Sequence, residues 1–157
     1  MILRCASEKD AAGVEALRRA NQEAVGFIPF SRYVAVTRDK PCCLLVASDT
    51  PETVDGFLYW TPGLPVAAIQ QLVVDVNHRG QGIGRLLVVS ALRLMVQDSC
   101  RFGVTLRCRA NLPSVGFWQG QGFDVVRSSL SGRRGPVLRL YRELRPALLP
   151  LGSYLPR

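Results

Sequence analysis

The chain has 157 residues, of which 48% are hydrophobic, and a formal net charge of +8. This length suits one domain with a sheet-centred core. No apolar run approaches the roughly 20 residues of a membrane span, and the first residues do not resemble a signal peptide. We therefore expect one cytoplasmic domain over residues 1–145, without a membrane partner.

The positive charge is unevenly distributed. Residues 1–100 contain 10 lysines and arginines against 10 acidic residues, whereas residues 101–157 contain 10 arginines against Asp124 and Glu143. The excess therefore belongs to the C-terminal third. Such a region is either a solvated face or a surface that attracts an anionic cofactor, an acidic partner or RNA.

The five cysteines are Cys5, Cys42, Cys43, Cys100 and Cys108. They form no Cys-x-x-Cys pair, and a single histidine leaves too few ligands for a zinc site. We expect no metal, and reduced cysteines that act as small buried hydrophobic residues. Cys108 has arginine neighbours that would activate a thiol, but strand alternation directs them to the opposite face.

The N-terminal part predicts one strand followed by two helices. A short apolar segment at 2–6 precedes Ser7, which begins a helix with an apolar stripe. Ser31 is expected to cap a second helix that runs to about Arg38, before Pro41.

The middle of the chain predicts three strands and a long helix. The buried-looking run 42–47 and the segment 56–61 form a hairpin around the turn 50–53. Residues 67–76 have strand composition. Residues 84–97 predict a helix that is apolar around most of its circumference and is therefore largely buried.

The C-terminal part predicts a strand at 104–109, a short helix that Pro113 opens, and two strands at 123–127 and 137–144 joined by the basic loop 131–135. The element order is βααβββαβαββ. Long helices between strands favour a mixed α/β sheet over a sandwich.

The turn Arg79-Gly80-Gln81-Gly82-Ile83-Gly84 lies between a predicted strand and a predicted helix. Backbone N–H groups and the positive end of a helix suit a diphosphate, and glycine allows close approach. The segment is not a P-loop, and Arg85 replaces the last glycine of a dinucleotide-binding motif. The alternative is a helix whose start is rich in glycine.

Residues 72–87 resemble the principal motif of the GCN5-related N-acetyltransferase (GNAT) family, whose R/Q-x-x-G-x-G/A signature falls on Arg79, Gly82 and Gly84. Residues 111–123 are similar to the later family motif N-x-x-[SA]-x-x-F-Y-x-x-x-G-F. The element order matches this family from Ile2 to Leu144.

The resemblance implies an acyl-coenzyme A N-acyltransferase fold with a splayed central sheet, and acetyl-coenzyme A as co-substrate. The main chain before the turn would pair with the pantetheine arm, the turn would hold the pyrophosphate, and a backbone N–H near Val73 or Val74 would form an oxyanion hole. The expected cofactor-binding residues are Val74, Asp75, Val76, Arg79, Gly80, Gln81, Gly82, Ile83, Gly84, Arg85, Asn111, Ser114 and Phe117.

The catalytic positions depart from the family pattern. Where the family often has a glutamate base, this chain has Gln70 and Gln71. An amide takes no proton at useful pH, so either water and main-chain carbonyls relay the proton or a carboxylate such as Glu23 substitutes. Alternatively, both glutamines are ordinary polar strand residues.

The tyrosine that protonates the departing thiolate in the family is replaced by Trp118, whose indole donates a hydrogen bond but no proton. Ser114 or a water is then the candidate partner of the sulfur. Trp118 is either a wall of the acyl pocket or plain core packing.

The leading hypothesis is an atypical N-acetyltransferase that acts on a primary amine of a small molecule or a protein. The alternatives are a catalytically weak or inactive coenzyme A-binding module, and a toxin-like enzyme that acetylates aminoacyl-tRNA. The apolar tail, residues 146–157, either packs on a second copy of the chain in a homodimer or is disordered.

Overall fold

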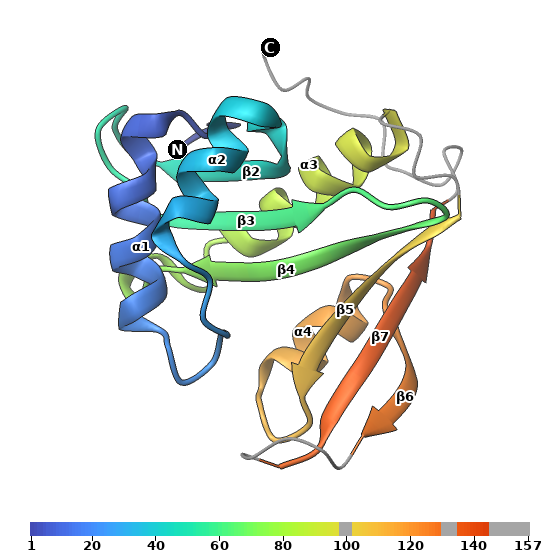
Figure 1. Cartoon of the computed structure of the whole chain (residues 1–157). Coiled ribbons are helices and arrows are strands. Elements are labelled where there is room, and N and C mark those ends of the chain that lie inside the picture. Colours follow the sequence, from blue (N-terminus) through green and yellow to red (C-terminus); the bar gives the residue numbers. More distant parts are fainter. Residues whose placement is uncertain (98–101, 130–134, 145–157) are drawn as a thin grey trace.

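The computed structural model describes residues 1–97, 102–129 and 135–144 (Figure 1). The strands are β1 (Ile2–Cys5), β2 (Leu44–Ser48), β3 (Gly56–Thr61), β4 (Val66–Val74), β5 (Gly103–Arg109), β6 (Asp124–Ser129) and β7 (Val137–Glu143). The α-helices are α1 (Ala11–Ala20), α2 (Phe30–Asp39), α3 (Ile83–Gln97) and α4 (Ser114–Gly120). The predicted element order is confirmed. Among the described helices, none is long and apolar enough to cross a membrane.

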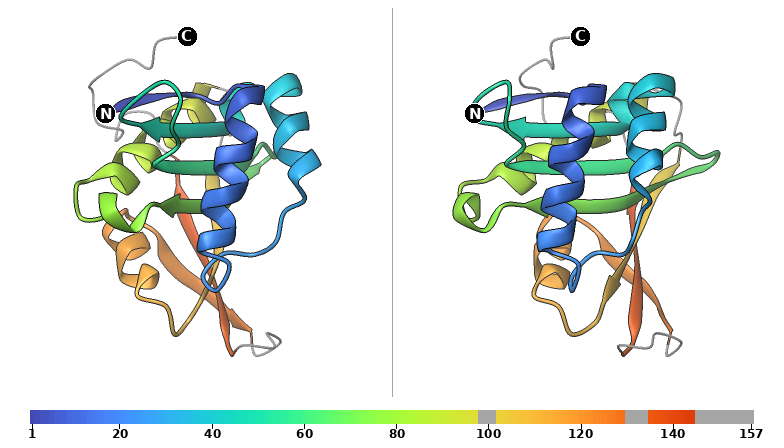
Figure 2. Two further views of the ribbon diagram at one scale, coloured as in Figure 1. Left: turned by 90° about the vertical axis from the view of Figure 1, so that its left-hand side faces the viewer. Right: turned by 60° about the vertical axis from the view of Figure 1, so that its left-hand side comes forward.

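All seven strands form one mixed sheet in the order β1-β2-β3-β4-β5-β7-β6. Helices α1 and α2 lie on one side of it, over β1 to β4, whereas α3 and α4 lie on the other side (Figures 1 and 2). Each layer has its own buried cluster. Leu87, Ala91 and Met95 of α3 pack on the sheet from one side, and Val14 and Tyr33 of α1 and α2 pack from the other.

The parallel strands β4 and β5 separate along their length. They pair only where Val66–Ala68 face Gly103–Thr105, and beyond this point they diverge (Figure 1). The second half of β4 is therefore bonded to β3 alone, which leaves its other edge open. This V-shaped opening confirms the expected splay and creates space in the middle of the sheet.

A bulge interrupts β4 just where the strands part. Tyr59 of β3 faces Gln71 and the next residue, Trp60, faces Ile69, so Gln70 has no partner on β3. Because one extra residue reverses the alternation of side chains, Ile69 belongs to the α3 cluster and Val73 to the α1–α2 cluster.

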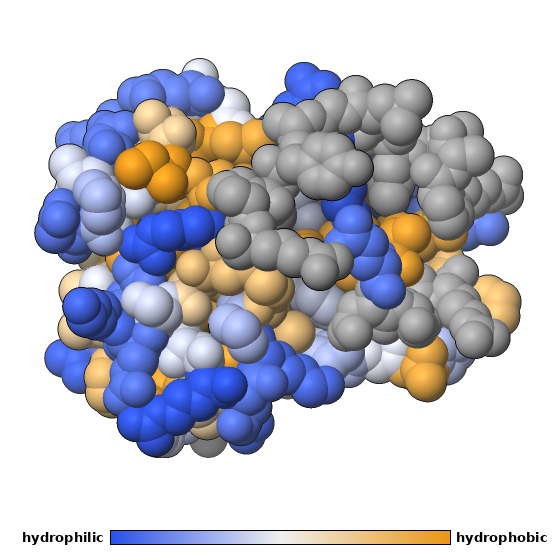
Figure 3. Space-filling view, turned by 90° about the horizontal axis from the view of Figure 1, so that it is seen from above, coloured by the Kyte–Doolittle hydropathy of each residue, from blue (hydrophilic) through white to orange (hydrophobic). Residues whose placement is uncertain are grey.

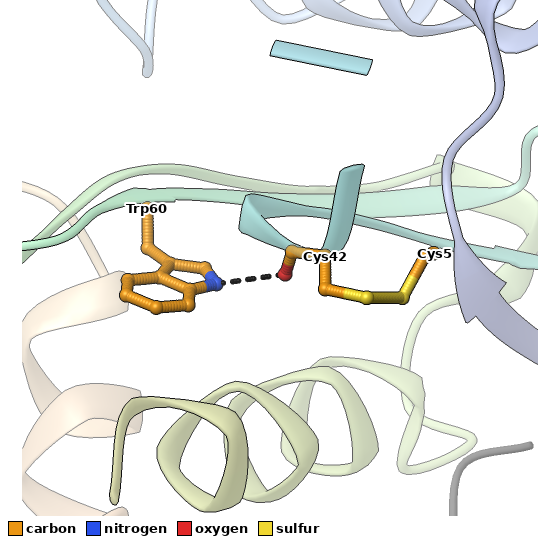
Figure 4. Close-up of a disulfide and its surroundings, with 3 residues drawn as sticks. All are labelled: Cys5, Cys42 and Trp60. Atoms are coloured by element: carbon orange, nitrogen blue, oxygen red, sulfur yellow. Dashed lines mark hydrogen bonds between the residues drawn. A yellow bond between two sulfur atoms is a disulfide. The ribbon is translucent and has the colours of Figure 1, made fainter. Parts of the chain in front are cut away.

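The expectation that all cysteines are reduced is wrong for Cys5 and Cys42, which form a disulfide across 37 residues of sequence (Figure 4). Strand pairing brings them together: Cys5 faces Leu45 on β2, and a 3-10 turn at Pro41–Cys43 places Cys42 beside it, with 4.7 Å between the Cα atoms. Cys108 is a buried free thiol, as expected, and Cys43 is also buried, whereas Cys100 lies outside the described residues.

Several predicted boundaries differ from the structure. Helix α2 begins at Phe30, with Pro29 as its N-cap, so Ser31 is not the cap. Residues 41–43 form a 3-10 turn rather than the start of β2, and further 3-10 turns lie at Glu8–Asp10, before α1, and at Val76–His78, after β4. Residues 131–134 of the basic loop and the tail 146–157 lie outside the described residues.

Figure 3 looks down on the β1 edge of the sheet. Hydrophilic side chains predominate over the visible surface, and hydrophobic ones gather in small groups between them. The divergence of β4 and β5 lies at the other end of the molecule from this edge (Figure 1).

Candidate functional site

The glycine-rich turn joins the 3-10 turn after β4 to the start of α3. Gly80 and Gly82 have φ angles of 76° and 82°, a left-handed backbone that glycine adopts without strain. A Cβ at either position would meet no atom within 4 Å. The glycines are therefore needed for their backbone shape, and the space above them is open.

The turn and the first residues of α3 present backbone amides to this space. The first four N–H groups of an α-helix have no partner within the helix. Gly80, Gln81 and Gly82 are exposed, and so is Arg85, the third residue of α3. This is the arrangement that suits a diphosphate.

Two residues that were expected to bind the cofactor have side chains that form hydrogen bonds within the protein. Arg79 donates from Nε to the Val74 carbonyl (3.1 Å) and from Nη2 to Oδ1 of Asn21 at the end of α1 (2.7 Å). The Asp75 carboxylate accepts from the Asn77 amide and so closes the 3-10 turn. Arg79 and Asp75 thus shape the turn, and sequence analysis missed the role of Asn21.

The main chain at Val74 lies on the open edge of β4. The Asp75 N–H bonds to the Asp55 carbonyl on the β3 side (2.8 Å), so alternation turns the amide of Val74 toward β5. The Val74 carbonyl keeps one free lone pair beside its bond from Arg79. Val76, by contrast, lies in the 3-10 turn and is 67% exposed.

The two sequence motifs meet at Gly84 and Phe117. A Cβ on Gly84 would come within 3.3 Å of Cζ of Phe117. A side chain at Gly84 would therefore require the Phe117 ring of α4 to move by a few tenths of an ångström away from the start of α3. Asn111 lies apart from this contact, exposed in the turn between β5 and α4.

A cleft of about 1020 Å³ opens between the separated strands. Gln70 and Gln71 of β4, and Ser114, Phe117 and Trp118 of α4, all line it. Strand β5 contributes Leu106–Arg109 to the lining of the cleft. The end of α1 and the loop after it, which includes Glu23, form another wall. The structure thus brings the candidate catalytic residues together around one space.

Gln71 is buried and held at both ends of its amide. Tyr33 donates from its hydroxyl to Oε1 (2.5 Å), and Nε2 donates to the Gly26 carbonyl (2.5 Å). Burial raises the pKa of Tyr33, so its hydroxyl remains a donor. Gln71 thus ties β4 to α2 and to the loop after α1.

Gln70, the bulge residue, is exposed, and its Nε2 donates to Oγ1 of Thr61 on β3 (3.0 Å). The two neighbouring glutamines therefore differ in kind. Gln71 is a buried tie between elements, whereas Gln70 presents its amide at the cleft surface.

Trp118 packs in the core and also contributes to the surface of the cleft. Its ring is 6% exposed and packs edge to face on Phe117 and Phe123, with centroids 5.2 and 5.3 Å away. It also lines the cleft. Ser114, at the start of the same helix, has its Oγ 3.2 Å from Sγ of Cys108.

Helix α1 contributes an ion-pair cluster that sequence analysis missed. Arg18 donates to both carboxylate oxygens of Glu15 (2.9 and 3.0 Å), and Arg19 donates to one of them (2.8 Å). These bonds, with that of Arg18 first, hold the pKa of Glu15 below its usual range. The Arg18 guanidinium also lies 5.3 Å from the ring centroid of the exposed Phe27. The i, i+3 and i, i+4 spacing was the available signal.

A second cavity, of about 460 Å³, lies beside the start of α3. Arg85 and Arg142 line it together with the glycine-rich end of α4. Arg142 is partly buried, which lowers the pKa of its guanidinium, and it donates to the Gln121 carbonyl (2.6 Å).

His78, directly before the glycine-rich turn, lies 3.4 Å from a carboxylate oxygen of Asp49 and 3.5 Å from one of Asp75. Ligand-type atoms of Asp49, Asp55 and His78 lie within 4.8 Å of one another. Asp49 is 57% exposed, and exposed acidic groups commonly lie this close together without binding a metal.

A model of the Acetyltransferase (GNAT) family matches residues 7–123. One similar solved structure is Ard1 from Thermoplasma volcanium, with 20% identity, coverage of 91% of this chain and 97% of that one, and a TM-score of 0.76. Another is a GNAT-family acetyltransferase from Streptococcus pneumoniae, with 16% identity, coverage of 92% of this chain and 99% of that one, and a TM-score of 0.77. A third is Rv2747 from Mycobacterium tuberculosis in complex with CoA and NLQ, with 15% identity, coverage of 92% of this chain and 100% of that one, and a TM-score of 0.73. At these identities the likeness concerns the fold. Among curated proteins, none matches the sequence.

Proposed function

Because the chain belongs to the acetyltransferase (GNAT) family, we propose that it transfers an acetyl group from acetyl-coenzyme A to a primary amine of a small molecule or a protein. One observation carries the proposal: the exposed glycine-rich turn at the start of α3 continues into the open edge of β4, which leads directly into the cleft. The coenzyme A in the similar Rv2747 structure supports the choice of donor.

In this proposal the turn amides between Gly80 and Arg85 hold the pyrophosphate, and the Val74 carbonyl on the open edge of β4 accepts a hydrogen bond from the pantetheine arm. Arg79 and Asp75 act indirectly, because their side chains hold the turn in shape. Arg85 and Arg142 lie at the second cavity, where two guanidinium groups suit a phosphate. Phe117 keeps α4 against the turn through its contact with Gly84.

The acceptor nitrogen attacks the thioester carbonyl, and the tetrahedral intermediate expels the thiolate of coenzyme A while the nitrogen loses its extra proton to water. The Val74 amide faces the open edge of β4 and is the proposed donor to the developing oxyanion. The amine must first lose a proton. Since the Gln71 amide already has a partner at each end, we assign this proton to water or to Glu23 at the cleft wall.

At the other end of the reaction, Trp118 forms a wall of the cleft and donates no proton. A thiol with a pKa near 8.5 leaves as its anion at modest cost, and general acid help is worth roughly 10² to 10⁴ in rate. Ser114, which lines the same cleft, is the proposed hydrogen-bond donor to the leaving sulfur.

A coenzyme A-binding module without activity is the second candidate. It is favoured by Gln71, whose buried amide is hydrogen-bonded at both ends and stands at a position where the family often has a base. The two candidates differ in one measurement, which is consumption of the thioester.

The test is release of thiol from acetyl-coenzyme A with a panel of amines and peptides. Turnover of at least one amine establishes the transferase, and coenzyme A binding with no turnover establishes the module. Gly82→Ala is compared with Gly135→Ala, because both residues have positive φ and open space around the Cβ position, but only Gly82 is in the turn. We expect each variant to lose about 1 kcal/mol of stability and only Gly82→Ala to lose affinity for coenzyme A. Equal affinity of the two variants would refute the role of the turn.

A further inference from the structure

Three arginines lie side by side on three adjacent strands of the C-terminal half of the sheet. Arg107 of β5 faces Arg139 of β7, which in turn faces Arg127 of β6. All three side chains are exposed. We call this set the arginine row. Like charges directly opposite one another destabilise a sheet, so the row has no structural benefit of its own.

The arginine row is on the face of the sheet that α4 leaves uncovered. Leu106 and Leu140, next to row members along their strands, are buried in the core cluster on the α4 side. Because side chains alternate along a strand, the arginines point the opposite way. Among the described helices, none lies over this face of β5, β7 and β6 (Figures 1 and 2).

A bulge in β6 completes the row. Val125 faces Leu140, and the next paired residue is Arg127, which faces Arg139. The extra residue is Val126. Without the bulge, Val126 rather than Arg127 would stand opposite Arg139. Bulges commonly re-aim side chains beside functional sites.

The row begins at the cleft. Arg107 lines the cleft itself, together with Arg109 and Val137 on the same face. None of the ion pairs among the described residues includes a member of the row. The acidic residues of this face, Asp124 and Glu143, lie toward the end where β4 and β5 are still paired. The mouth of the cleft is therefore positive on its β5 side.

Resting on the proposed function, we propose that the acceptor is a polypeptide with acidic side chains close to its reacting amine, and that the arginine row binds those side chains. Strand spacing places the three guanidinium groups over about 10 Å, while same-side residues of an extended peptide are about 6.6 Å apart. Two or three carboxylates near the amine therefore match the row, and guanidinium groups bind carboxylates in a bidentate manner.

The polarity of the cleft favours a polypeptide over a nucleic acid. The positively charged amine enters beside the wall that carries Glu23, and the carboxylates remain outside at the row. Nucleic acid binding typically neutralises many phosphates over a long surface. A row of three arginines is short for that purpose.

The experiment compares two peptides with the same free N-terminus, one with aspartates at positions 2 to 4 and one with asparagines. The full chain, Arg139→Gln and Arg32→Gln are assayed by thiol release at low and high salt. Arg32 is an exposed arginine of α2 and controls for net charge. Arg139→Gln should fold at least as well as the parent chain, because it removes repulsion from the centre of the row.

We expect kcat/KM to be about tenfold higher for the acidic peptide at low salt and Arg139→Gln to reduce this preference about threefold to fivefold. Turnover of the asparagine peptide should be unchanged, and Arg32→Gln should keep the full preference. No preference in the parent chain, or an equal loss for both peptides in Arg139→Gln, would overturn the proposal.

Binding of N-acetylated, fluorescent versions of the two peptides separates this proposal from the proposed function, because it needs no chemistry. Arg139-dependent binding of the acidic peptide without thiol release from any amine would support the row and refute the transferase. Tighter binding of a single-stranded RNA than of the acidic peptide at physiological salt would overturn the proposal in favour of a nucleic acid.

Discussion

Gln71→Glu introduces a carboxyl where the family often has its base, and the structure indicates that this position tolerates a neutral side chain only. In the parent chain, Tyr33 donates to Oε1 and Nε2 donates to Gly26. An ionised carboxylate keeps the Tyr33 bond but faces the Gly26 carbonyl without a proton, in a site that is only 4% exposed. We expect the variant to be destabilised at neutral pH.

The loss of stability depends on whether the introduced carboxyl is ionised or protonated in the folded state, and the state with the lower free energy predominates. An unsatisfied buried acceptor costs about 1–3 kcal/mol. Alternatively, the carboxyl binds a proton and donates to Gly26. Holding a proton at pH 8 on a group with an unfolded pKa near 4.3 costs about 5 kcal/mol, against about 1 kcal/mol at pH 5. The loss is therefore about 1–3 kcal/mol at pH 8 and at most about 1 kcal/mol at pH 5.

The sign of the pH dependence is fixed by the same linkage. The folded-state pKa of the introduced carboxyl is raised, so its contribution to stability is fully present below the unfolded pKa and is lost as the pH rises through the folded pKa. The assay is urea unfolding at pH 5 and pH 8, with each variant compared with the parent chain.

Gln70→Glu is the matched control, because it makes the same change one residue away at an exposed site. It should stay within about 0.5 kcal/mol of the parent chain at both pH values. If Gln71→Glu loses no more stability than this control at pH 8, or if its loss does not shrink at pH 5, the reasoning about Gln71 is wrong.

Three further changes test other parts of the structure. Trp118→Tyr should raise the rate of thiol release by up to about 10² if a proton donor is what the site lacks; an unchanged or lower rate across pH would count against a missing acid. Cys42→Ser removes the bond to Cys5 and should lower the free energy of unfolding by about 3–4 kcal/mol, whereas an equal melting temperature with and without reductant in the parent chain would show that the bond contributes nothing. Asp10 is 6% exposed; burial opposes its ionisation, but bonds from Arg4 and the Ser7 backbone outweigh this and hold its pKa below the usual value. Asp10→Asn should therefore cost about 1–3 kcal/mol above pH 5, with the difference from the parent chain shrinking below pH 4; a difference independent of pH would refute the ionic role.

Sequence analysis predicted the element order and the glycine-rich turn because both rest on local patterns. The segment 56–61 was bounded by turn residues on both sides and matches β3 residue for residue. The glycines of the turn were predicted because they allow close approach of a diphosphate, whereas the structure shows that Gly80 and Gly82 are needed for their positive φ.

The features that escaped sequence analysis depend on pairing between distant segments. The Cys5–Cys42 bond requires β1 to lie beside the chain that enters β2, and nothing in the spacing of the cysteines signals this. The different fates of Gln70 and Gln71 come from a bulge, which exists only in relation to β3. Gln71 also depends on Tyr33, 38 residues away.

The two tryptophans lie in different places, and each can serve as a spectroscopic probe of its own surroundings. The indole of Trp60 donates to the Cys42 carbonyl (3.0 Å), directly beside the disulfide (Figure 4). Trp118 lines the cleft between β4 and β5. Disulfides quench nearby indole emission, so single-tryptophan forms of the chain would separate the two signals. Emission from Trp60 would follow the oxidation state of the Cys5–Cys42 pair, and emission from Trp118 would follow entry of a molecule into the cleft.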